Sequence, residues 1–175
     1  MTLTALAAEP SPSGIERFEE LYRSSAGDIY SYVASLLRDA SAAEDVTALA
    51  FERAYRRRAL FDLRRGTPRA WLFAIARNAA LDELRRRGRT TPLVDDIADE
   101  AVDVGGDDDD VAERRLLVRD ALAALEPRER EVVLLKFVGR LSNSELGRVL
   151  GCSETAAGTR LHRAVERLRE ACNAT

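Results

Sequence analysis

Apolar residues recur at intervals of three and four along most of this chain, and this spacing limits the fold more than any other feature. Residues spaced in this way fall on one face of a helix, whereas a half-buried strand requires strict alternation of apolar and polar residues. We find no run with that alternation. The spacing therefore predicts an all-α protein, whose first helix or helix pair has Gly27 as its weak point and carries Ile15, Phe18, Leu21, Tyr22, Ile29, Tyr32, Val33, Leu36 and Leu37.

Cap signals divide the first half of the chain into further helices. Ser41 and Glu44 match the capping box S-x-x-E and predict a second helix that ends near Arg58. The pair Thr67-Pro68 predicts the start of a third helix, because proline is favoured at the first helical position. Between these two helices, the sequence FDLRRG (residues 61–66) predicts a short loop.

The last part of the sequence has the order of a helix-turn-helix. A second capping box, Ser142 to Glu145, opens the helix SNSELGRVL. Gly151-Cys152-Ser153 then predicts a tight turn, and Ser153 is placed to cap a longer final helix of roughly residues 154–169. Two helices joined by a short turn that contains glycine are typical of a DNA-binding helix-turn-helix.

Charge is spread unevenly along the chain, although the formal net charge is only −3. Residues 1–90 carry 15 arginines against 12 acids, and residues 114–175 carry 12 bases against 8 acids, so both ends suit a nucleic-acid partner. Residues 91–113 carry 10 acids and no base, and have too few large apolar residues to fold alone. We therefore expect a flexible tail (1–14), a helical domain (15–89), an acidic flexible linker (90–112) and a second helical domain (113–172).

The third helix has an unusual polar ridge beside its apolar stripe. The stripe consists of Leu72, Ile75, Ala76 and Ala79. On a helical wheel, an arc of about 60° beside it holds Trp71, Asn78, Asp82 and Arg85. The ridge thus places an indole, an amide, a carboxylate and a guanidinium in line. For Trp71 itself we favour a role as a core anchor.

The final helix separates an apolar stripe from a face that can donate and accept hydrogen bonds. The stripe consists of Ala157, Leu161, Ala164, Val165 and Leu168, and the opposite face of Thr155, Thr159, His162, Arg163 and Glu166. In a major groove, arginine pairs with guanine edges while threonine and histidine reach bases or phosphates. The alternative is a solvated helix face. We favour an exposed or DNA-facing His162 over a catalytic base, and for Cys152 we favour packing of the turn over redox sensing.

Composition argues against several other classes of protein. With one histidine, and with Cys152 and Cys172 far apart in sequence, we expect no metal site, no cofactor and no catalytic cluster. No apolar run approaches the roughly 20 residues that span a bilayer, and the first 14 residues lack the pattern of a secretion signal. We expect a cytoplasmic protein that is not an enzyme.

Three segments carry a resemblance to a known family. The sequences AED…FERAYR, WLFAIARNAALDELRRR and LEPREREVVLLKFVGRLSNSELGRVLGCSETAAGTRLHRAVERLRE, with the acidic segment before the third, resemble the bacterial extracytoplasmic-function (ECF) sigma factors over residues 15–170. The most specific pieces are W-L-F-x-I-A-R-N-x-x-x-D-x-x-R and Leu-x-x-Arg-Glu-Arg-Glu. The resemblance implies a subunit that binds core RNA polymerase, recognises and melts promoter DNA for transcription initiation, and is held inactive by an anti-sigma factor.

The resemblance also implies roles for individual residues. The minus-ten promoter element would be bound by Phe61, Asp62, Arg64, Arg69, Trp71, Arg77, Asn78, Asp82, Arg85 and Arg86. The minus-thirty-five element would be bound by Thr155, Thr159, Arg160, His162 and Arg163. The clamp helices of the polymerase beta-prime subunit would be bound by Asp45, Val46, Leu49, Glu52, Arg53 and Arg56, and the second domain would contact the flap of the beta subunit.

The chain departs from the family pattern at two places. Where relatives usually carry Gln-Glu in the clamp-binding helix, this chain has Ala48-Leu49. The final helix opens with residues 155–158, TAAG, in place of a Gly-Thr-Val-Lys/Arg pattern, and Gly158 costs about 1 kcal/mol of helix stability against alanine. We expect weaker or altered upstream recognition. The acidic linker either enters a positively charged channel of the polymerase or is a solvated spacer.

Two other functions fit part of the pattern. In a conventional transcription regulator, only the last domain would bind DNA, without polymerase. In a helical adaptor protein, neither domain would bind DNA, and the polar faces of the third and last helices would be dispensable.

Overall fold

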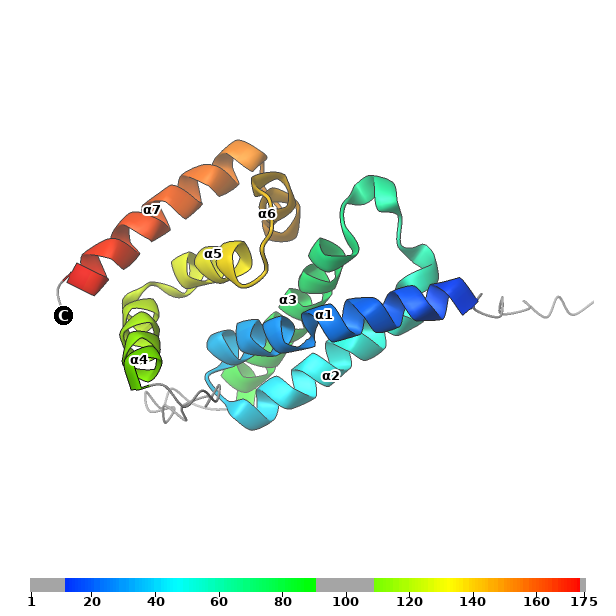
Figure 1. Ribbon diagram of the computed structural model, residues 1–175, viewed down its shortest axis with the longest axis horizontal. Helices are drawn as coiled ribbons and strands as arrows, with labels where there is room; N and C mark the ends of the chain where they lie inside the picture. The colour runs from blue at the N-terminus through cyan, green and yellow to red at the C-terminus, as the bar shows by residue number, and fades with distance from the viewer. Residues whose placement is uncertain (1–11, 91–108, 174–175) are drawn as a thin grey trace, which may run out of the picture.

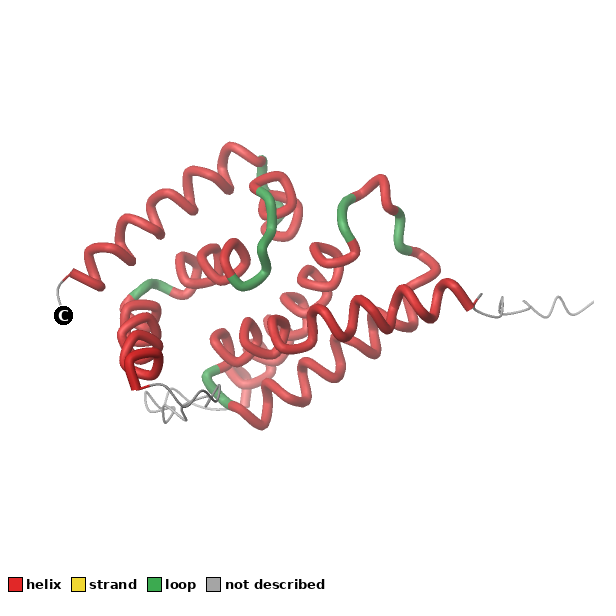
Figure 2. The backbone as a smooth tube through the Cα atoms, in the orientation of Figure 1, coloured by secondary structure: helices red, strands yellow, loops and turns green. Residues whose placement is uncertain are grey.

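A computed structural model of the protein describes residues 12–90 and 109–173, and within these ranges every regular element is helical (Figures 1 and 2). The predicted all-α fold is confirmed. The elements are α1 (Pro12–Leu37), α2 (Ala40–Arg57), the short 3-10 turns η1 (Arg58–Leu60) and η2 (Leu63–Arg65), α3 (Pro68–Thr90), α4 (Asp109–Ala124), α5 (Pro127–Phe137), α6 (Asn143–Leu150) and α7 (Glu154–Asn173).

The helices form two groups, which Figure 1 shows on opposite sides of the molecule. We refer to α1–α3 as the amino-terminal domain and to α4–α7 as the carboxy-terminal domain. Helix α1 runs unbroken past Gly27 and begins at Pro12, three residues before Ile15, where the sequence predicts the first helix. Similarly, α4 begins at Asp109, inside the expected linker. The remainder of that acidic segment lies outside the described residues.

The start of α2 corrects one prediction from the sequence. Ser41 and Glu44 do not form a capping box; the helix begins at Ala40 and its N-cap is Asp39. The Asp39 backbone is extended, and its carboxylate accepts a hydrogen bond from the Ala42 backbone N–H at 3.0 Å. Aspartate is among the strongest N-cap residues, and here it precedes the serine by two positions, so the serine lies inside the first turn.

Other helix boundaries agree with the sequence. The Thr67 hydroxyl caps α3 by accepting from the Ala70 N–H at 3.2 Å. Ser142 and Glu145 form the predicted capping box at the start of α6. At the turn before α7, Gly151 adopts a left-handed conformation, with φ of 68°, and the Ser153 hydroxyl accepts from the Ala156 N–H. The helix-turn-helix is therefore built by local hydrogen bonds that its own residues specify.

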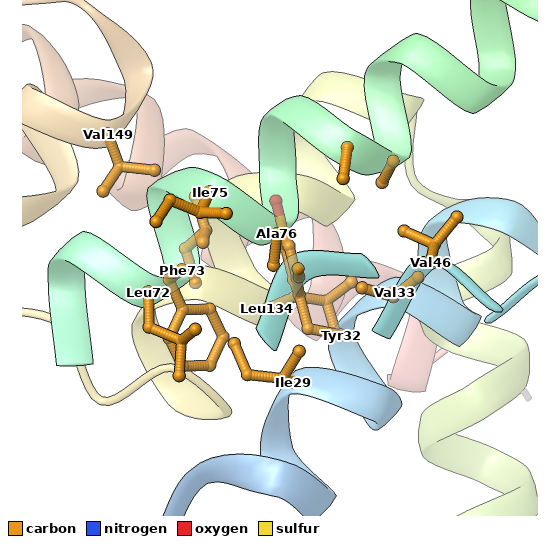
Figure 3. Packing of buried hydrophobic residues seen from close by; sticks show 14 of the residues in the cluster. Ile29, Tyr32, Val33, Val46, Leu72, Phe73, Ile75, Ala76, Leu134 and Val149 are labelled. Atoms are coloured by element: carbon orange, nitrogen blue, oxygen red, sulfur yellow. The ribbon is translucent and has the colours of Figure 1, made fainter. Parts of the chain in front are cut away.

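One hydrophobic core runs through both domains. It joins Ile29, Tyr32, Leu72 and Phe73 of α1 and α3 with Leu134 and Leu135 of α5 and with Leu146 and Val149 of α6. Figure 3 shows Val149 and Leu134 among residues of α1 and α3. All four residues of the apolar stripe predicted for α3 are buried, but so are Phe73 and Ala80. Helix α3 thus buries a wider face than its predicted stripe.

Candidate nucleic-acid interface

The polar ridge of α3 is exposed in the structure, apart from Trp71. Asn78, Asp82 and Arg85 are all exposed, and the carboxylate of Asp82 pairs with Arg53 of α2 at 3.6 Å and with Arg85 at 3.4 Å. Ion pairs as exposed as these contribute little to stability. The ridge therefore presents an amide, a carboxylate and guanidinium groups to solvent along one side of the amino-terminal domain.

Trp71 is half-buried and packs against Phe61 of the preceding loop. The two ring centroids lie 5.2 Å apart with the planes tilted by 45°. Trp71 also packs against the shared core, which agrees with the core-anchor role that the sequence favours. Both rings also line a pocket between the two domains.

The conformation of the loop before α3 depends on a local cap and on a glycine. Asp62 caps η2, since its carboxylate accepts from the Arg64 N–H at 2.9 Å. Gly66 has φ of +137°, a conformation that side chains disfavour, and turns the chain into α3. Beneath the loop lies a pocket of about 200 Å³, which is lined by Leu60, Phe61, Asp62, Arg65, Thr67, Ala70, Trp71, Ala74, Glu145, Arg148 and Val149.

Arginines at the end of α3 are engaged by acidic neighbours. Both Arg86 and Arg87 donate to the carboxylate of Glu83, and Arg87 also donates to the Asp39 carboxylate that caps α2, at 2.8 Å. Hydrogen bonds first from Arg86 and then from Arg87 lower the pKa of Glu83 to about 2. The Asp39 pKa is also lowered, by the Ala42 N–H and then by Arg87. Arg87 thus ties the end of α3 to the start of α2.

This cluster predicts a pH dependence of stability. The pKa of Glu83 is about 2 in the folded chain, below the value of about 4.3 for an unfolded glutamate. The ionised carboxylate therefore stabilises the fold above about pH 4.5, and this contribution is lost as the pH falls toward 2. We expect Glu83→Gln to lower the urea midpoint at pH 7, and the difference from the wild type to shrink steadily below pH 4.5. A difference that is constant from pH 7 to pH 3 would rule out this role.

Two arginines that the resemblance assigns to the minus-ten element lie between the two domains. Arg77 donates to Glu131 of α5 at 2.6 Å, and the pair is largely buried, with side-chain exposures of 21% and 10%. Arg69 donates to the backbone carbonyls of Val138 and Gly139, at 2.9 and 2.6 Å, and pairs with Asp28 of α1. In this arrangement neither arginine faces a nucleic acid.

The outer face of α7 is exposed as the sequence predicts. Thr155, Thr159, Arg160, His162 and Arg163 are all exposed, whereas Ala157 and Ala164 are fully buried. Thr159 donates back to the Thr155 carbonyl at 3.0 Å. Cys152 is half-buried in the turn, and its backbone N–H donates to the Gly147 carbonyl at 2.8 Å, in keeping with a packing role.

The residues that the resemblance places on the polymerase are exposed or half-buried on α2, except for Val46. Asp45, Leu49, Glu52 and Arg56 are exposed and Arg53 is half-buried, and Arg56 pairs with Glu52 at 2.6 Å. Val46 is only 5% exposed and belongs to the hydrophobic core. It follows Ala43 and precedes Ala50 on the buried stripe, so its side chain points away from the surface that a partner would meet.

The sequence analysis does not identify two glutamates that contact the other domain. Glu131 is 8% exposed at the start of a buried apolar run, although charged residues are rarely buried unless they are paired. For Glu145 the sequence predicts only a capping box, but its carboxylate also accepts a hydrogen bond from the Thr67 hydroxyl of the other domain, at 2.5 Å. Glu131 directly precedes an apolar run, and this position indicates that its side chain is buried. The run consists of Val132, Val133, Leu134 and Leu135.

No helix in residues 12–90 or 109–173 has the length and apolar content that crossing a membrane requires.

Comparison with known proteins identifies the family. Residues 21–90 match the family model of Sigma-70 region 2, and residues 115–168 match that of Sigma-70 region 4. The chain is 35% identical to the RNA polymerase sigma factor CarQ of Myxococcus xanthus, covering 89% of this chain and 88% of CarQ. It is 34% identical to the ECF RNA polymerase sigma factor SigL of Mycobacterium tuberculosis, covering 85% of each.

The fold matches a solved sigma factor as well. The sigma factor RpoE of Bartonella quintana, solved with the anti-sigma factor NepR, superposes with a TM-score of 0.72 at 23% identity, over 90% of this chain and 98% of RpoE. Two family matches in the expected order, full-length relatives and a shared two-domain helical fold lead to one assignment. This chain belongs to the ECF sigma factors of RNA polymerase.

Proposed function

We propose that this protein binds core RNA polymerase through the exposed face of α2, melts the minus-ten element with the ridge of α3, and reads the minus-thirty-five element with α7. The observation that carries the proposal is the pair of polar faces, one on each domain, that the fold leaves exposed. Asn78, Asp82 and Arg85 form the first, and Thr155, Thr159, Arg160, His162 and Arg163 the second. In this proposal the polymerase supplies the chemistry of RNA synthesis, and the chain itself is not an enzyme. We also propose that it acts in the cytoplasm, where it would meet the polymerase.

For the polymerase contacts, we place the clamp helices of the beta-prime subunit on Asp45, Leu49, Glu52, Arg53 and Arg56. Leu49 is 36% exposed and supplies apolar area between charged neighbours. This surface suits a partner helix with its own charged flanks. The flap of the beta subunit would bind the carboxy-terminal domain. We propose residues 15–89 and 113–172 as the two domains. Helices α1 and α4 begin a few residues before these limits, and α3 and α7 each end one residue after them.

An anti-sigma factor is the second partner we propose. RpoE, which shares this fold, was solved in complex with one. The domains of our chain carry exposed apolar side chains, among them Leu60, at 81% exposure, and Phe137, at 62%. Covering such side chains would favour binding of a protein inhibitor.

Transcription with purified components tests the proposal. We expect the protein to co-purify with core polymerase and to direct run-off transcription from specific fragments of a genomic library. A conventional regulator would bind duplex DNA without polymerase and would give no transcripts. An adaptor would do neither.

Single substitutions test the two DNA faces separately. Asn78→Ala should lower the yield of open complex, and Arg163→Ala should weaken upstream recognition, each by about 5- to 100-fold, because one contact to a base contributes about 1–3 kcal/mol. Asn173→Ala and Arg128→Ala, at exposed positions away from both faces, are the matched controls. Yields equal to wild type for both test variants would favour the adaptor.

A further inference from the structure

A buried carboxylate holds the two domains together at one point. Glu131 accepts from Arg77 through both of its oxygens, at 2.6 and 3.4 Å, and the Tyr32 hydroxyl lies 3.4 Å from the nearer oxygen. Burial, followed by the charge of Glu131, raises the pKa of Tyr32 well above its usual value. Arg77 and Tyr32 come from the amino-terminal domain and Glu131 from the carboxy-terminal one. The Glu131 carboxylate thus binds the Arg77 guanidinium, which the minus-ten surface would otherwise offer to a phosphate.

A second contact fastens the end of α5 to the amino-terminal domain. Arg69 donates to the backbone carbonyls of Val138, which is the C-cap of α5, and of Gly139, which follows it. The same guanidinium donates to the Asp28 carboxylate at 2.5 Å and to the Ser25 hydroxyl at 3.3 Å. Separation of the domains would leave these carbonyls to water and return Arg69 to the surface of α3.

A third contact lays α6 over the loop before α3. The Thr67 hydroxyl donates to Glu145 at 2.5 Å, and Arg148 donates to the Arg65 carbonyl at 2.8 Å. Arg148 fits so closely that a Cβ on Gly66 would lie 3.0 Å from its Nη1 atom. Because Glu145 and Arg148 also line the pocket beside Trp71, the carboxy-terminal domain forms one wall of the site where an unstacked base would enter.

We propose that the isolated chain is closed on itself, with Glu131 in the place of a DNA phosphate on Arg77 and α6 over the loop of residues 61–67, so that this surface is available only after the domains separate. The closure is a property of the chain alone. Its masking of DNA rests on the proposed function. The carboxylate and a phosphate compete for one guanidinium, so the open and closed states exclude each other at Arg77.

Distance measurements on the full chain test the closure without DNA or polymerase. Spin labels on Ala48→Cys in α2 and on native Cys172 in α7, in a Cys152→Ala background, report the separation of the domains by double electron–electron resonance. Ala48 and Cys172 are exposed, and Cys152 is half-buried in the turn before α7. We expect one narrow distribution for the parent chain and a broader, longer one for Glu131→Gln. A broad distribution in the parent, or an unchanged one in Glu131→Gln, would overturn the closure.

Two further variants separate a lost contact from a damaged fold. Glu19→Gln removes a glutamate that pairs with Arg23 on the exposed side of α1, at 3.2 Å, and should leave the distribution unchanged. The exchange Arg77→Glu with Glu131→Arg restores the pair in reverse and should recover part of the narrow distribution. Helical circular dichroism equal to that of the parent is required of each variant. Recovery no better than in the single variants would argue against the pair as the cause.

Binding of a fluorescein-labelled single-stranded oligonucleotide of random sequence tests the masking. If the open state is below about a tenth of the population, opening the chain raises the apparent affinity about tenfold, because only the open fraction binds. We expect this gain for Glu131→Gln and none for Glu19→Gln. If the domains separate without any gain in affinity, the closure stands and the masking of DNA is rejected, whereas transcription by the parent chain decides the proposed function independently.

Discussion

Replacing Phe73 by alanine is expected to lower the free energy of unfolding by about 3–5 kcal/mol, the range for a large aromatic removed from a core. Phe73 is fully buried, its ring meets Tyr32 edge-on at a centroid distance of 5.5 Å, and the Arg69 guanidinium lies 5.2 Å from its centre. These neighbours are themselves fixed by other contacts, so the cavity cannot collapse. Urea unfolding followed by circular dichroism measures the loss.

Phe137→Ala is the matched control for this experiment. The same ring is removed, but Phe137 is 62% exposed at the end of α5, and we expect a change within about 0.5 kcal/mol. Because the core runs through both domains, fluorescence of Trp71, the only tryptophan, should follow the same transition as circular dichroism. Similar losses in the two phenylalanine variants, or a loss below 1 kcal/mol for Phe73→Ala, would contradict this account of the core.

Gly147→Ala should destabilise the helix-turn-helix, by about 1–3 kcal/mol, even though alanine is the better helix former. A Cβ at this position in α6 would lie 2.8 Å from the Cys152 carbonyl oxygen and 3.1 Å from the Glu154 nitrogen. Both atoms belong to the backbone of the turn that leads into α7, so they cannot move aside as a side chain would. The thermal midpoint and binding to duplex promoter DNA should both fall.

Gly158→Ala makes the same chemical change one helix later, with the opposite expected sign. In α7 the added Cβ would meet only the Asn143 side-chain nitrogen at 3.7 Å, an ordinary contact. The gain in helix propensity is then about 1 kcal/mol, and the thermal midpoint should rise. If both variants shift the midpoint in the same direction, close packing of α6 against the turn is not what requires glycine at position 147.

Helix positions and most caps could be predicted from the sequence because they depend on neighbouring residues. Thr67, Ser142 and Ser153 cap the helices that they precede, and the outer face of α7 is exposed where the wheel places it. The prediction at Ser41 is wrong because Asp39, two residues earlier, is the N-cap. One oxygen of Asp39 accepts from the Ala42 N–H, and the other accepts from Arg87 of α3. Arg87 belongs to another helix, so the sequence pattern around Ser41 does not contain this contact.

The spacing of apolar and polar residues is enough to predict that this protein is helical, has a helix-turn-helix near its end, and offers polar faces on α3 and α7, since a helical face follows from spacing alone. Which of those polar residues are bound to another part of the chain depends on how the helices pack. Arg77 and Glu131 lie 54 positions apart on different domains, and periodicity within one helix cannot name a partner on another. The burial of Phe73 and Ala80 beyond the predicted stripe of α3 has the same cause, because the amount of a helix that is covered depends on what packs against it.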